Sequence, residues 1–410
     1  MVLKRPSSTS IAILFSVVSI FITGAFFAIM IKDGYIIGTP IAMADTGQVG
    51  DFIGGVVGTV ISAAAFYFLY MTFSEQRKTS YRQHVESHFY EMLRAYQTNV
   101  KSMKYDATSL LVDKGSLYIA PRVYESKEIF DVIFMQLVTC RNELKHLLCK
   151  HSRLYISEYE KHLLENDQIT NRKIDIYELG YIDIAYNIVY YGTSSEGMVV
   201  LRNQLYKRYK KRLVDIILKY ISLKPASNKY LFKKWNYISS RKRRRQIIDL
   251  VEDVYEWRQK KVINGYQPMF PQYSVGYNND FVKYYKGFQH ILGHYYRQLF
   301  HMVTYINEQI YFDYQTKYDY VKNIRTLMSN SEQVLLFFNS ISCLGRQWEL
   351  EAELNPKLRK YCLSDYQLIT KYDLIKNIPD EMLYGVNYKS YYPFVNYEHE
   401  SIKHAKLLYN

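Results

Sequence analysis

The sequence predicts an all-α protein: an N-terminal two-helix transmembrane hairpin followed by a large helical cytoplasmic domain. Two long, uncharged apolar runs occupy the first 73 residues. Apolar residues recur every three or four positions through much of the remaining chain, and glycine and proline are sparse after residue 75. No run of alternating apolar and polar residues indicates strands, so the fold class is helical throughout.

The two apolar runs extend from Ile11 to Ile31 and from Phe52 to Phe73. Each has about the ~20 residues that a helix needs to cross a bilayer. Small residues suited to close helix packing gather near one face of the second run, namely Gly54, Gly55, Gly58, Ser62 and Ala63 to Ala65. They favour packing against the first span or a second copy, although small residues are also common in membrane helices. We therefore expect a homo-oligomer.

Flanking charges predict the orientation of the hairpin. Basic residues stand outside the two spans, whereas the connecting loop is acidic overall, with Lys32 against three aspartates. The outer basic residues are Lys4, Arg5, Arg77, Lys78 and Arg82. By the positive-inside bias, both termini are cytoplasmic and the protein is multi-pass. A signal peptide cleaved near Ala42-Met-Ala44 is the weaker alternative, because the first apolar run exceeds the ~7 to 15 residues of a secretory signal.

The chain divides into four regions: the hairpin at 1–75, an amphipathic stalk and first helices at 76–150, a basic helical insert at 151–275, and a C-terminal helical domain at 276–410. The stalk continues the second span, because apolar residues recur at helical spacing. They are Val85, Phe89, Met92, Tyr96, Val100 and Met103. A loop containing Gly115 and Pro121 follows.

Further helices are expected along the soluble part, with a turn-like Gly192 to Gly197 segment and a loop at 264–276. The expected helices run from Ser126 to Leu148, Ile174 to Tyr191, Met198 to Ile221, Asp280 to about Phe312, Tyr318 to Met328 and Ser331 to Leu350. The four cysteines, Cys140, Cys149, Cys343 and Cys362, lack metal-ligand or CxxC spacing. A reducing cytoplasmic setting without a metal or cofactor follows.

Positive charge is concentrated in one segment. Between Arg202 and Lys261 there are 19 Lys and Arg against 5 Asp and Glu, an excess equal to the net charge of +14 of the whole chain. The densest groups are Lys207, Arg208, Lys210, Lys211 and Arg212, and then Arg241, Lys242, Arg243, Arg244 and Arg245. Such a segment suits RNA or anionic lipid. A solvated helix face is the alternative, because the segment also carries an ordinary apolar face.

A histidine stripe lies in the helix expected from Asp280. At 100° per residue, His290, His294, Arg297 and His301, together with Glu308, fall on the side opposite the apolar residues. Imidazoles exchange protons near neutral pH, and an arginine stabilises a phosphoryl oxyanion. This combination indicates RNA cleavage without a metal, since the acidic residue of the HExxH zinc motif is missing. A polar face that happens to hold histidines is the alternative.

Three blocks resemble the phage abortive infection proteins of the AbiC type. They are Gly50-Asp-Phe-Ile-Gly-Gly55 with Thr72-Phe-Ser-Glu-Gln76, then Leu292-Gly-His-Tyr-Tyr-Arg-Gln-Leu-Phe-His301, and then Ile324-Arg325 with Ser329, Glu332 and Leu335-Leu-Phe-Phe-Asn339. The blocks lie in matching order and cover the anchor and the C-terminal half. The resemblance implies a bacterial membrane protein that limits phage propagation, usually at the cost of the infected cell, after a phage component triggers it.

Within that resemblance, Arg297 and His301 are similar to the Arg-x4-6-His motif of HEPN ribonucleases. Here three residues intervene, and Gln298 stands where Asn, Asp or His is usual. Together with the histidine stripe, this resemblance makes His294, Arg297 and His301 the candidate catalytic residues, with His290, Arg325 and Asn339 as possible supporting residues. Ser329 and Glu332 also form a capping-box pattern, and a polar contact that orients two helices is the favoured alternative for Arg325 and Asn339.

Two functions therefore remain open for a membrane-anchored defence protein. In the first, the histidine stripe cleaves RNA, completed across a dimer if necessary, and the basic segment holds the substrate. In the second, the protein is a non-enzymatic phage sensor or switch that oligomerises through its transmembrane hairpin and perturbs the membrane.

Overall fold

The computed structural model describes residues 8–32, 47, 50, 51, 53–113, 116–147, 174–222, 285–350 and 367–398. The chain forms two compact units, Met1–His88 and Phe89–Asn410, and the long helix α3 (Gly58–Ser102) belongs to both. The described part is mostly helical, as the sequence predicts, with one small sheet as the exception.

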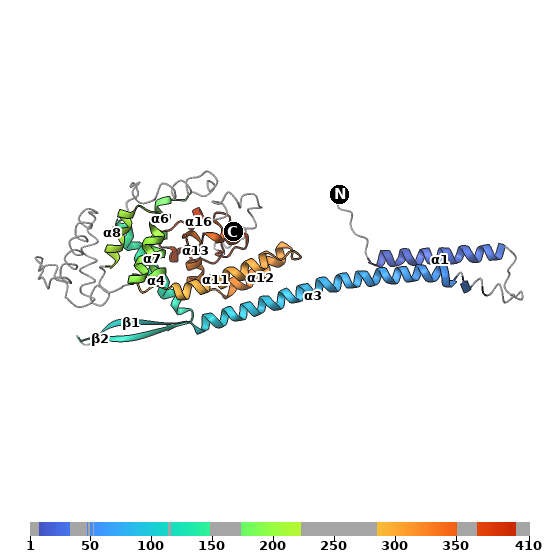
Figure 1. Cartoon of the computed structure of the whole chain (residues 1–410), viewed down its shortest axis with the longest axis horizontal. Coiled ribbons are helices and arrows are strands. Elements are labelled where there is room, and N and C mark those ends of the chain that lie inside the picture. The colour runs from blue at the N-terminus through green and yellow to red at the C-terminus, as the bar shows by residue number, and fades with distance from the viewer. Residues whose placement is uncertain are drawn as a thin grey trace, which may run out of the picture. The chain divides into compact units, whose positions relative to one another are not determined.

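The first unit contains α1 (Ser8–Lys32), a π-helical turn (Ile53–Val57) and the beginning of α3. α1 and α3 lie side by side (Figure 1), with the rings of Phe15 and Tyr67 6.4 Å apart. Judged by length and composition alone, both helices can cross a membrane, and no residue of either apolar stretch is buried. The two predicted apolar spans are therefore helical.

Helix α3 runs for 45 residues without interruption. This confirms the prediction that the second apolar span continues as an amphipathic helix. Phe89, Tyr96 and Val100 on its predicted apolar face are buried. The beginning of α3 is apolar and exposed, whereas its end is amphipathic and half-buried. This pattern is expected when the surroundings of a helix change along its axis.

The expected loop around Gly115 and Pro121 is wrong. Strand β1 (Lys104–Asp113) pairs antiparallel with β2 (Ser116–Glu125), from Lys104 opposite Glu125 to Asp113 opposite Ser116. Two residues, Lys114-Gly115, separate the strands, and a glycine in a two-residue connection is a hairpin signal. Pro121 argues against a strand in the sequence, because proline cannot donate to a strand ladder. It is tolerated here because both strands are edge strands.

Helix α4 (Glu128–Leu147) confirms the helix predicted from Ser126, and its predicted apolar side is buried at Ile129, Ile133, Leu137, Cys140 and Leu144. Helix α6 (Ile176–Tyr191) begins at an N-cap, where the Asp175 carboxylate accepts from the backbone N–H of Tyr177 at 3.0 Å. α4 packs on α6. α6 ends at Gly192, which has a φ of 75°.

The single helix expected from Met198 to Ile221 is two helices, α7 (Ser195–Leu205) and α8 (Lys211–Ser222). The break occurs where Arg208 and Tyr209 turn inward to Asp183. Tyr209 is buried and its hydroxyl donates to that carboxylate at 2.6 Å. A tertiary contact thus overrides the helical periodicity of the segment.

Helix α11 (Gln289–Asn307) begins later than expected, and Asp280 itself lies outside the described residues. Before it, residues 285–288 run against the end of α6, where Phe288 N donates to Tyr190 O at 2.9 Å. A Cβ on Gly192 would lie 2.6 Å from the backbone nitrogen of Gly287, which has a φ of 89°. Only two glycines allow this approach, so the segment cannot be helical.

Helix α12 (Tyr314–Leu327) and helix α13 (Asn330–Ile341) follow, and short turns complete the unit. The turns are η4 (Arg346–Trp348), α15 (Leu368–Lys371), η7 (Asp380–Leu383) and α16 (Tyr388–Tyr391). α13 packs on α4 and α6 and is buried from Ser331 to Ile341, so it forms the centre of the unit (Figure 1). Its predicted extension to Leu350 is wrong, because the Ser342 hydroxyl donates to Asn339 O at 2.8 Å and the chain folds back.

Candidate functional site

The histidine stripe lies on the exposed side of α11. His290, His294, Arg297 and His301 are all exposed, while Leu292, Tyr295, Leu299 and Val303 on the other side are buried. The two faces that the sequence predicts therefore exist. The stripe presents three imidazoles and one guanidinium to solvent over three turns of helix.

Contacts within the stripe are few. The Arg297 Nε donates to the carbonyl of Gly293 at 2.8 Å, so its guanidinium lies back along its own helix. Within the described ranges, no hydrogen bond or ion pair joins the three histidines to one another or to Arg297. These side chains share a helix face, but the monomer does not assemble them into a hydrogen-bonded catalytic group.

Arg325 and Asn339, the predicted supporting residues, lie elsewhere. Arg325 is buried, and its guanidinium donates to the carbonyls of Tyr372 and Asp373 at 3.1 and 2.9 Å. Asn339 is buried on α13 and donates to the hydroxyl of Tyr186 on α6 at 3.0 Å. Asn339 thus joins two helices, α13 and α6, and Arg325 joins α12 to the turn at Tyr372 and Asp373.

A buried carboxylate connects three helices of the second unit. Glu332 on α13 is fully buried, and its Oε1 accepts from the hydroxyls of Tyr295 at 3.1 Å and Tyr96 at 3.3 Å. Its other oxygen accepts from the backbone N–H of Ser329 at 2.6 Å, which completes the predicted capping box. Burial, with the nearby carboxylate, holds the pKa values of both tyrosines well above their usual range. We call Tyr96, Tyr295 and Glu332 the tyrosine clasp.

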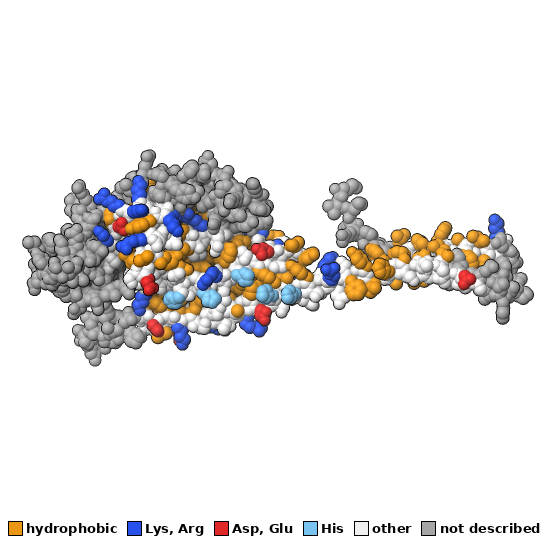
Figure 2. Space-filling view, in the orientation of Figure 1, with side chains coloured by type: hydrophobic (Ala, Val, Ile, Leu, Met, Phe, Trp, Pro, Cys, Tyr) orange, Lys and Arg blue, Asp and Glu red, His pale blue; other side chains and the backbone are white. Residues whose placement is uncertain are grey.

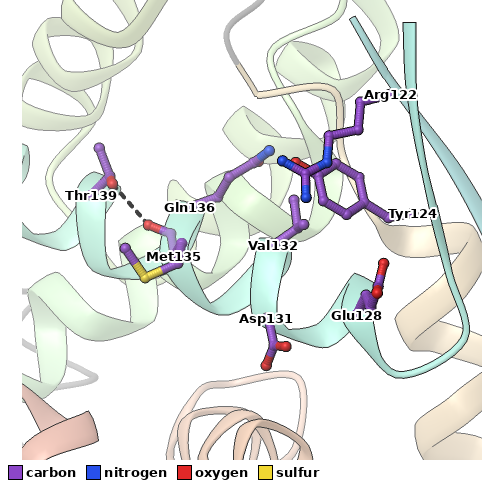
Figure 3. A pocket seen from close by; sticks show the side chains of 8 residues that line it. All are labelled: Arg122, Tyr124, Glu128, Asp131, Val132, Met135, Gln136 and Thr139. Atoms are coloured by element: carbon purple, nitrogen blue, oxygen red, sulfur yellow. Dashed lines mark hydrogen bonds between the residues drawn. The ribbon is translucent and has the colours of Figure 1, made fainter. Parts of the chain in front are cut away.

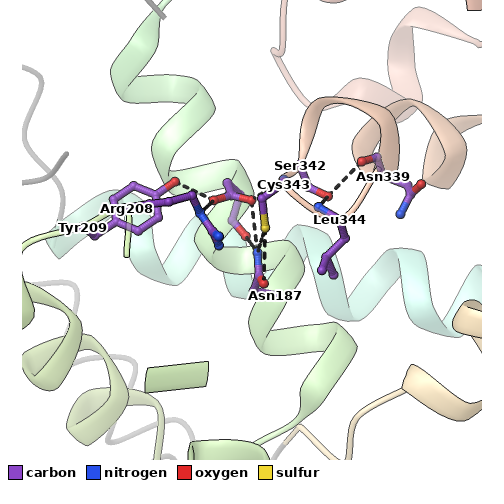
Figure 4. Close-up of polar contacts among 8 residues, drawn as sticks. Asn187, Arg208, Tyr209, Asn339, Ser342, Cys343 and Leu344 are labelled. Atoms are coloured by element: carbon purple, nitrogen blue, oxygen red, sulfur yellow. Dashed lines mark hydrogen bonds and ion pairs between the residues drawn. The ribbon is translucent and has the colours of Figure 1, made fainter. Parts of the chain in front are cut away.

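A second buried carboxylate, Asp183 on α6, accepts from four groups (Figure 4). The donors are Arg208 Nε at 3.3 Å, the Tyr209 hydroxyl at 2.6 Å, Asn187 Nδ2 at 3.1 Å and the Cys343 backbone N–H at 2.8 Å. Burial opposes ionisation, but the charges of Arg208 and Arg346 and these hydrogen bonds hold the pKa of Asp183 below its ordinary value. Burial and the same carboxylate raise the pKa of the Cys343 thiol to about 12, which favours its protonated form.

The basic segment is only partly described. Lys207, Lys210, Lys211 and Arg212 are exposed at the junction of α7 and α8, and Figure 2 shows Lys and Arg side chains over this region. Arg208 differs from them, because it is paired with Asp183 and has a structural role. Arg241, Lys242, Arg243, Arg244 and Arg245 lie outside the described residues. Four exposed positive charges remain available to a phosphate-rich partner.

One groove, which the sequence did not predict, lies between β2 and α4 (Figure 3). It has a volume of about 480 Å³ and is open to solvent. The guanidinium of Arg122 lies over the Tyr124 ring, 4.7 Å from its centre, and Glu128 and Asp131 line the opposite wall. The sequence does not predict this groove, because it predicts a loop where the hairpin forms one wall. Its mixed charges identify no single class of ligand.

The part of the chain that the structure describes contains no group of three or more His, Cys, Asp or Glu side chains arranged to hold a metal ion. The polar features of the described part of the second unit include an exposed histidine face, an exposed basic junction, an open groove and four buried carboxylates, Asp183, Glu332, Glu349 and Asp373. The buried carboxylates were not predicted as a connected network, although Glu332 was recognised as a helix cap.

Comparison with known families identifies one segment. Residues 287–383 match the family model described as "Putative phage abortive infection protein". The predicted resemblance is thus confirmed for the segment that contains α11, α12 and α13, and it supports a role in anti-phage defence. Comparisons with curated proteins and with solved structures gave no match.

Proposed function

We propose that this protein is an anti-phage defence switch, anchored in the bacterial cell membrane by α1 and the first part of α3, with both termini in the cytoplasm. A phage component is the trigger, and a homo-oligomer formed through the hairpin perturbs the membrane. The family match of residues 287–383 supports the defence role. The length and composition of the two apolar helices and the basic residues outside them support the anchoring and orientation.

One observation carries the switch. Helix α3 continues without a break from its apolar beginning to Ser102 and brings Tyr96 into the tyrosine clasp with Tyr295 and Glu332. Those two partners come from α11 and α13, the helices of the family-matched segment. Rigid elements joined by buried hydrogen bonds couple the positions of their ends. A structural change in the helices that carry Tyr295 and Glu332 would therefore change the position of α3.

The clasp gives a test of this coupling. Tyr96→Phe removes one buried hydroxyl but keeps the ring, and we expect infected cells to lose at least about tenfold of their protection against phage. Membrane depolarisation during infection should be lost with it. Tyr90→Phe is the matched control, because Tyr90 lies on the same helix but is exposed. Full protection by Tyr96→Phe at normal expression would contradict the switch.

The hairpin gives a second test. A chain without residues 1–75 should not protect, and Leu substitution of Gly54, Gly55 and Gly58 should abolish depolarisation. An added Cβ at Gly54 or Gly55 meets no atom within 4 Å, so substitution at these positions is expected to act on packing against a neighbouring copy. Protection by the shortened chain would exclude membrane perturbation as the mechanism.

Metal-independent RNA cleavage is the second candidate function, favoured by the exposure of His294, Arg297 and His301 on one face of α11. Because the monomer leaves them unconnected, this function needs the substrate or a second copy to complete the site. His301→Ala should then abolish both protection and RNA cleavage in infected cells. Gln289→Ala, also exposed on α11, is the control. Intact RNA in infected cells that the wild-type protein protects would eliminate this function.

The basic junction of Lys207, Lys210, Lys211 and Arg212 is proposed to bind RNA or anionic lipid. One experiment distinguishes RNA from anionic lipid. The full chain in neutral-lipid nanodiscs is titrated with RNA and, in parallel, with anionic vesicles over a range of salt concentrations. Alanine substitution of Lys210, Lys211 and Arg212 should weaken binding to the true partner and reduce its salt dependence. Unchanged binding to both partners would remove this surface from the proposal.

A further inference from the structure

The C-terminal end of α6 places a tyrosine beside the histidine stripe. Gly293 on α11 has no side chain, and a Cβ at this position would lie 2.7 Å from the Tyr190 hydroxyl. The hydroxyl of Tyr190 therefore lies directly against the backbone of α11. A residue from a second helix thus borders the stripe, which the spacing of residues along α11 does not reveal.

Tyr190 is held in this position by its neighbours. Its ring stacks on Tyr186 at 6.3 Å and makes an edge contact with Tyr191 at 4.9 Å. Its carbonyl accepts from the backbone N–H of Phe288 at 2.9 Å, where the chain enters α11. Because the half-buried side chain is already fixed, its hydroxyl needs little reorganisation to bind a ligand.

The guanidinium of Arg297 lies near this hydroxyl. The Arg297 Nε donates to the Gly293 carbonyl at 2.8 Å, and this bond directs the guanidinium back towards the turn of α11 that Tyr190 contacts. Burial raises the pKa of Tyr190 above its ordinary value, although the charge of Arg297 lowers it. The hydroxyl is therefore protonated at neutral pH and can donate a hydrogen bond.

These donors have no acceptor in the ranges that the structure describes. There, neither the Tyr190 hydroxyl nor the terminal nitrogens of Arg297 make a hydrogen bond or an ion pair. Arg297 is exposed, and Figure 2 shows histidine side chains at the surface over α11. A guanidinium with free terminal nitrogens, beside a hydroxyl donor, matches the oxygen atoms of a phosphate group.

Two imidazoles flank this pair of donors. His294 precedes Arg297 by three residues and His301 follows it by four, so both are its neighbours on the exposed face of α11. Imidazoles exchange protons near neutral pH, and RNA carries a 2′-hydroxyl proton beside each phosphodiester. A phosphodiester of RNA is therefore the phosphate group that these surroundings suit.

We infer that Tyr190 and Arg297 form a phosphate site, which holds a phosphodiester group of RNA between His294 and His301. The inference rests on the proposed RNA cleavage, the second candidate function. It adds to that function a binding residue from α6, so that the site no longer depends on one helix alone.

Arginine footprinting of the full chain in neutral-lipid nanodiscs tests this inference. Phenylglyoxal modifies accessible guanidinium groups, and peptide mass spectrometry follows Arg297 separately from the arginines of the basic segment. The probe is a short 2′-O-methyl oligoribonucleotide, which offers phosphodiesters but no 2′-hydroxyl proton. We expect it to slow the modification of Arg297 at least about fivefold and to leave Arg77, exposed on α3, unchanged.

Variants of Tyr190 and its neighbours identify the hydroxyl. Tyr190→Phe keeps the ring, and the probe concentration that half-protects Arg297 should rise at least about tenfold. Gly293→Ala, whose methyl group displaces the hydroxyl, should have the same effect. Tyr191→Phe is the matched control and should leave protection unchanged, because Tyr191 is also half-buried but has Arg208 as its neighbouring positive charge.

The outcomes separate the phosphate site from the RNA cleavage on which it rests. Equal protection of Arg297 in wild type and Tyr190→Phe overturns the site, as does the absence of protection in wild type. Protection by inorganic phosphate, titrated in parallel, without protection by the oligoribonucleotide overturns RNA as the ligand. Protection that depends on Tyr190, together with intact RNA in infected cells, supports the phosphate site and eliminates cleavage.

Discussion

The exposed face of α11 and the buried polar groups around α13 carry the same kinds of side chain in opposite surroundings. Among the described residues, Arg297 on the exposed face bonds to the carbonyl of Gly293 in its own helix, whereas Arg325 bonds to the carbonyls of Tyr372 and Asp373 in a distant segment. Asp183 and Glu332 are fully buried, and each accepts from several donors. The buried polar groups connect separate segments of the chain, whereas the side chains of the stripe are exposed on a single helix.

This difference separates two kinds of experiment. A buried polar group is costly to leave without its partner, so its substitution should lower stability whatever the function. An exposed group contributes little to folding, so its substitution reports on function directly. The predictions that follow test this difference between buried and exposed groups, from the largest expected effect on stability to the smallest.

Asp183→Asn should have the largest effect. The side chain keeps its shape but leaves Arg208 and Arg346 without the buried counter-charge, and removal of one partner of a buried ion pair costs about 3 to 5 kcal/mol. The midpoint of thermal unfolding of the detergent-solubilised full chain should fall by roughly 5 to 15 °C at pH 7. Asp319→Asn, at an exposed position of α12, should leave it unchanged.

The difference in stability between wild type and Asp183→Asn should depend on pH, because the pKa of Asp183 is lowered in the folded protein. Its stabilisation is complete above the unfolded pKa, about 3.9, and is lost as pH falls through the lower folded value. The gap in stability between wild type and Asp183→Asn should therefore be constant near neutrality and narrow below about pH 4. A gap that stayed the same down to pH 3 would show that folding does not lower the pKa of this carboxylate.

Glu332→Ala should rank second, at about 3 kcal/mol, because it removes the acceptor for Tyr96, Tyr295 and the Ser329 N–H together. Urea or thermal unfolding of the full chain measures the loss. The matched control is Glu308→Ala, an exposed glutamate at the end of α11, with an expected change of less than about 0.5 kcal/mol. Equal losses for the two variants would break the distinction between exposed and buried groups.

Arg325→Ala and Arg297→Ala compare two arginines of the family-matched segment. Arg325→Ala should cost about 2 kcal/mol, since the carbonyls of Tyr372 and Asp373 lose their buried donor. Arg297→Ala should change stability by less than about 0.5 kcal/mol, because its bond to Gly293 is exposed. Denaturation midpoints of the two variants, measured side by side, check the difference, and a reversed order would contradict it.

Features of the fold that depend on local periodicity could be predicted from the sequence. The apolar helices, the continuation of α3 through Tyr96, and α4 with buried Ile133 follow from residue spacing along one helix. The break at Arg208 and Tyr209 could not, because it depends on Asp183, a residue far away in the sequence. The late start of α11 depends in the same way on the approach of Gly287 to Gly192.

The candidate site shows the same limit. Helical spacing placed His290, His294, Arg297 and His301 on one exposed face, which is a property of α11 alone. The position of that face relative to Arg325 and Asn339 depends on how α11, α12 and α13 pack together. The spacing of residues along one helix does not reveal that packing. The capping box of Glu332 was predictable because it is local, whereas its bonds to Tyr96 and Tyr295 were not.

The stripe itself gives the last prediction, with the smallest effect on stability and the largest consequence for mechanism. Replacement of His290, His294 and His301 by alanine should change the unfolding midpoint by less than about 2 °C, because all three side chains are exposed. Protection against phage then separates the two functions. Retained protection supports the switch, since the tyrosine clasp is intact.

Lost protection at normal expression and unchanged stability would instead favour the stripe as a binding or catalytic surface. RNA from infected cells decides between these two roles: cleavage by the wild-type protein that disappears in the variant indicates catalysis. A variant that unfolds well below the wild-type temperature would contradict the premise of the comparison, because it would show that these histidines make contacts on which the fold depends.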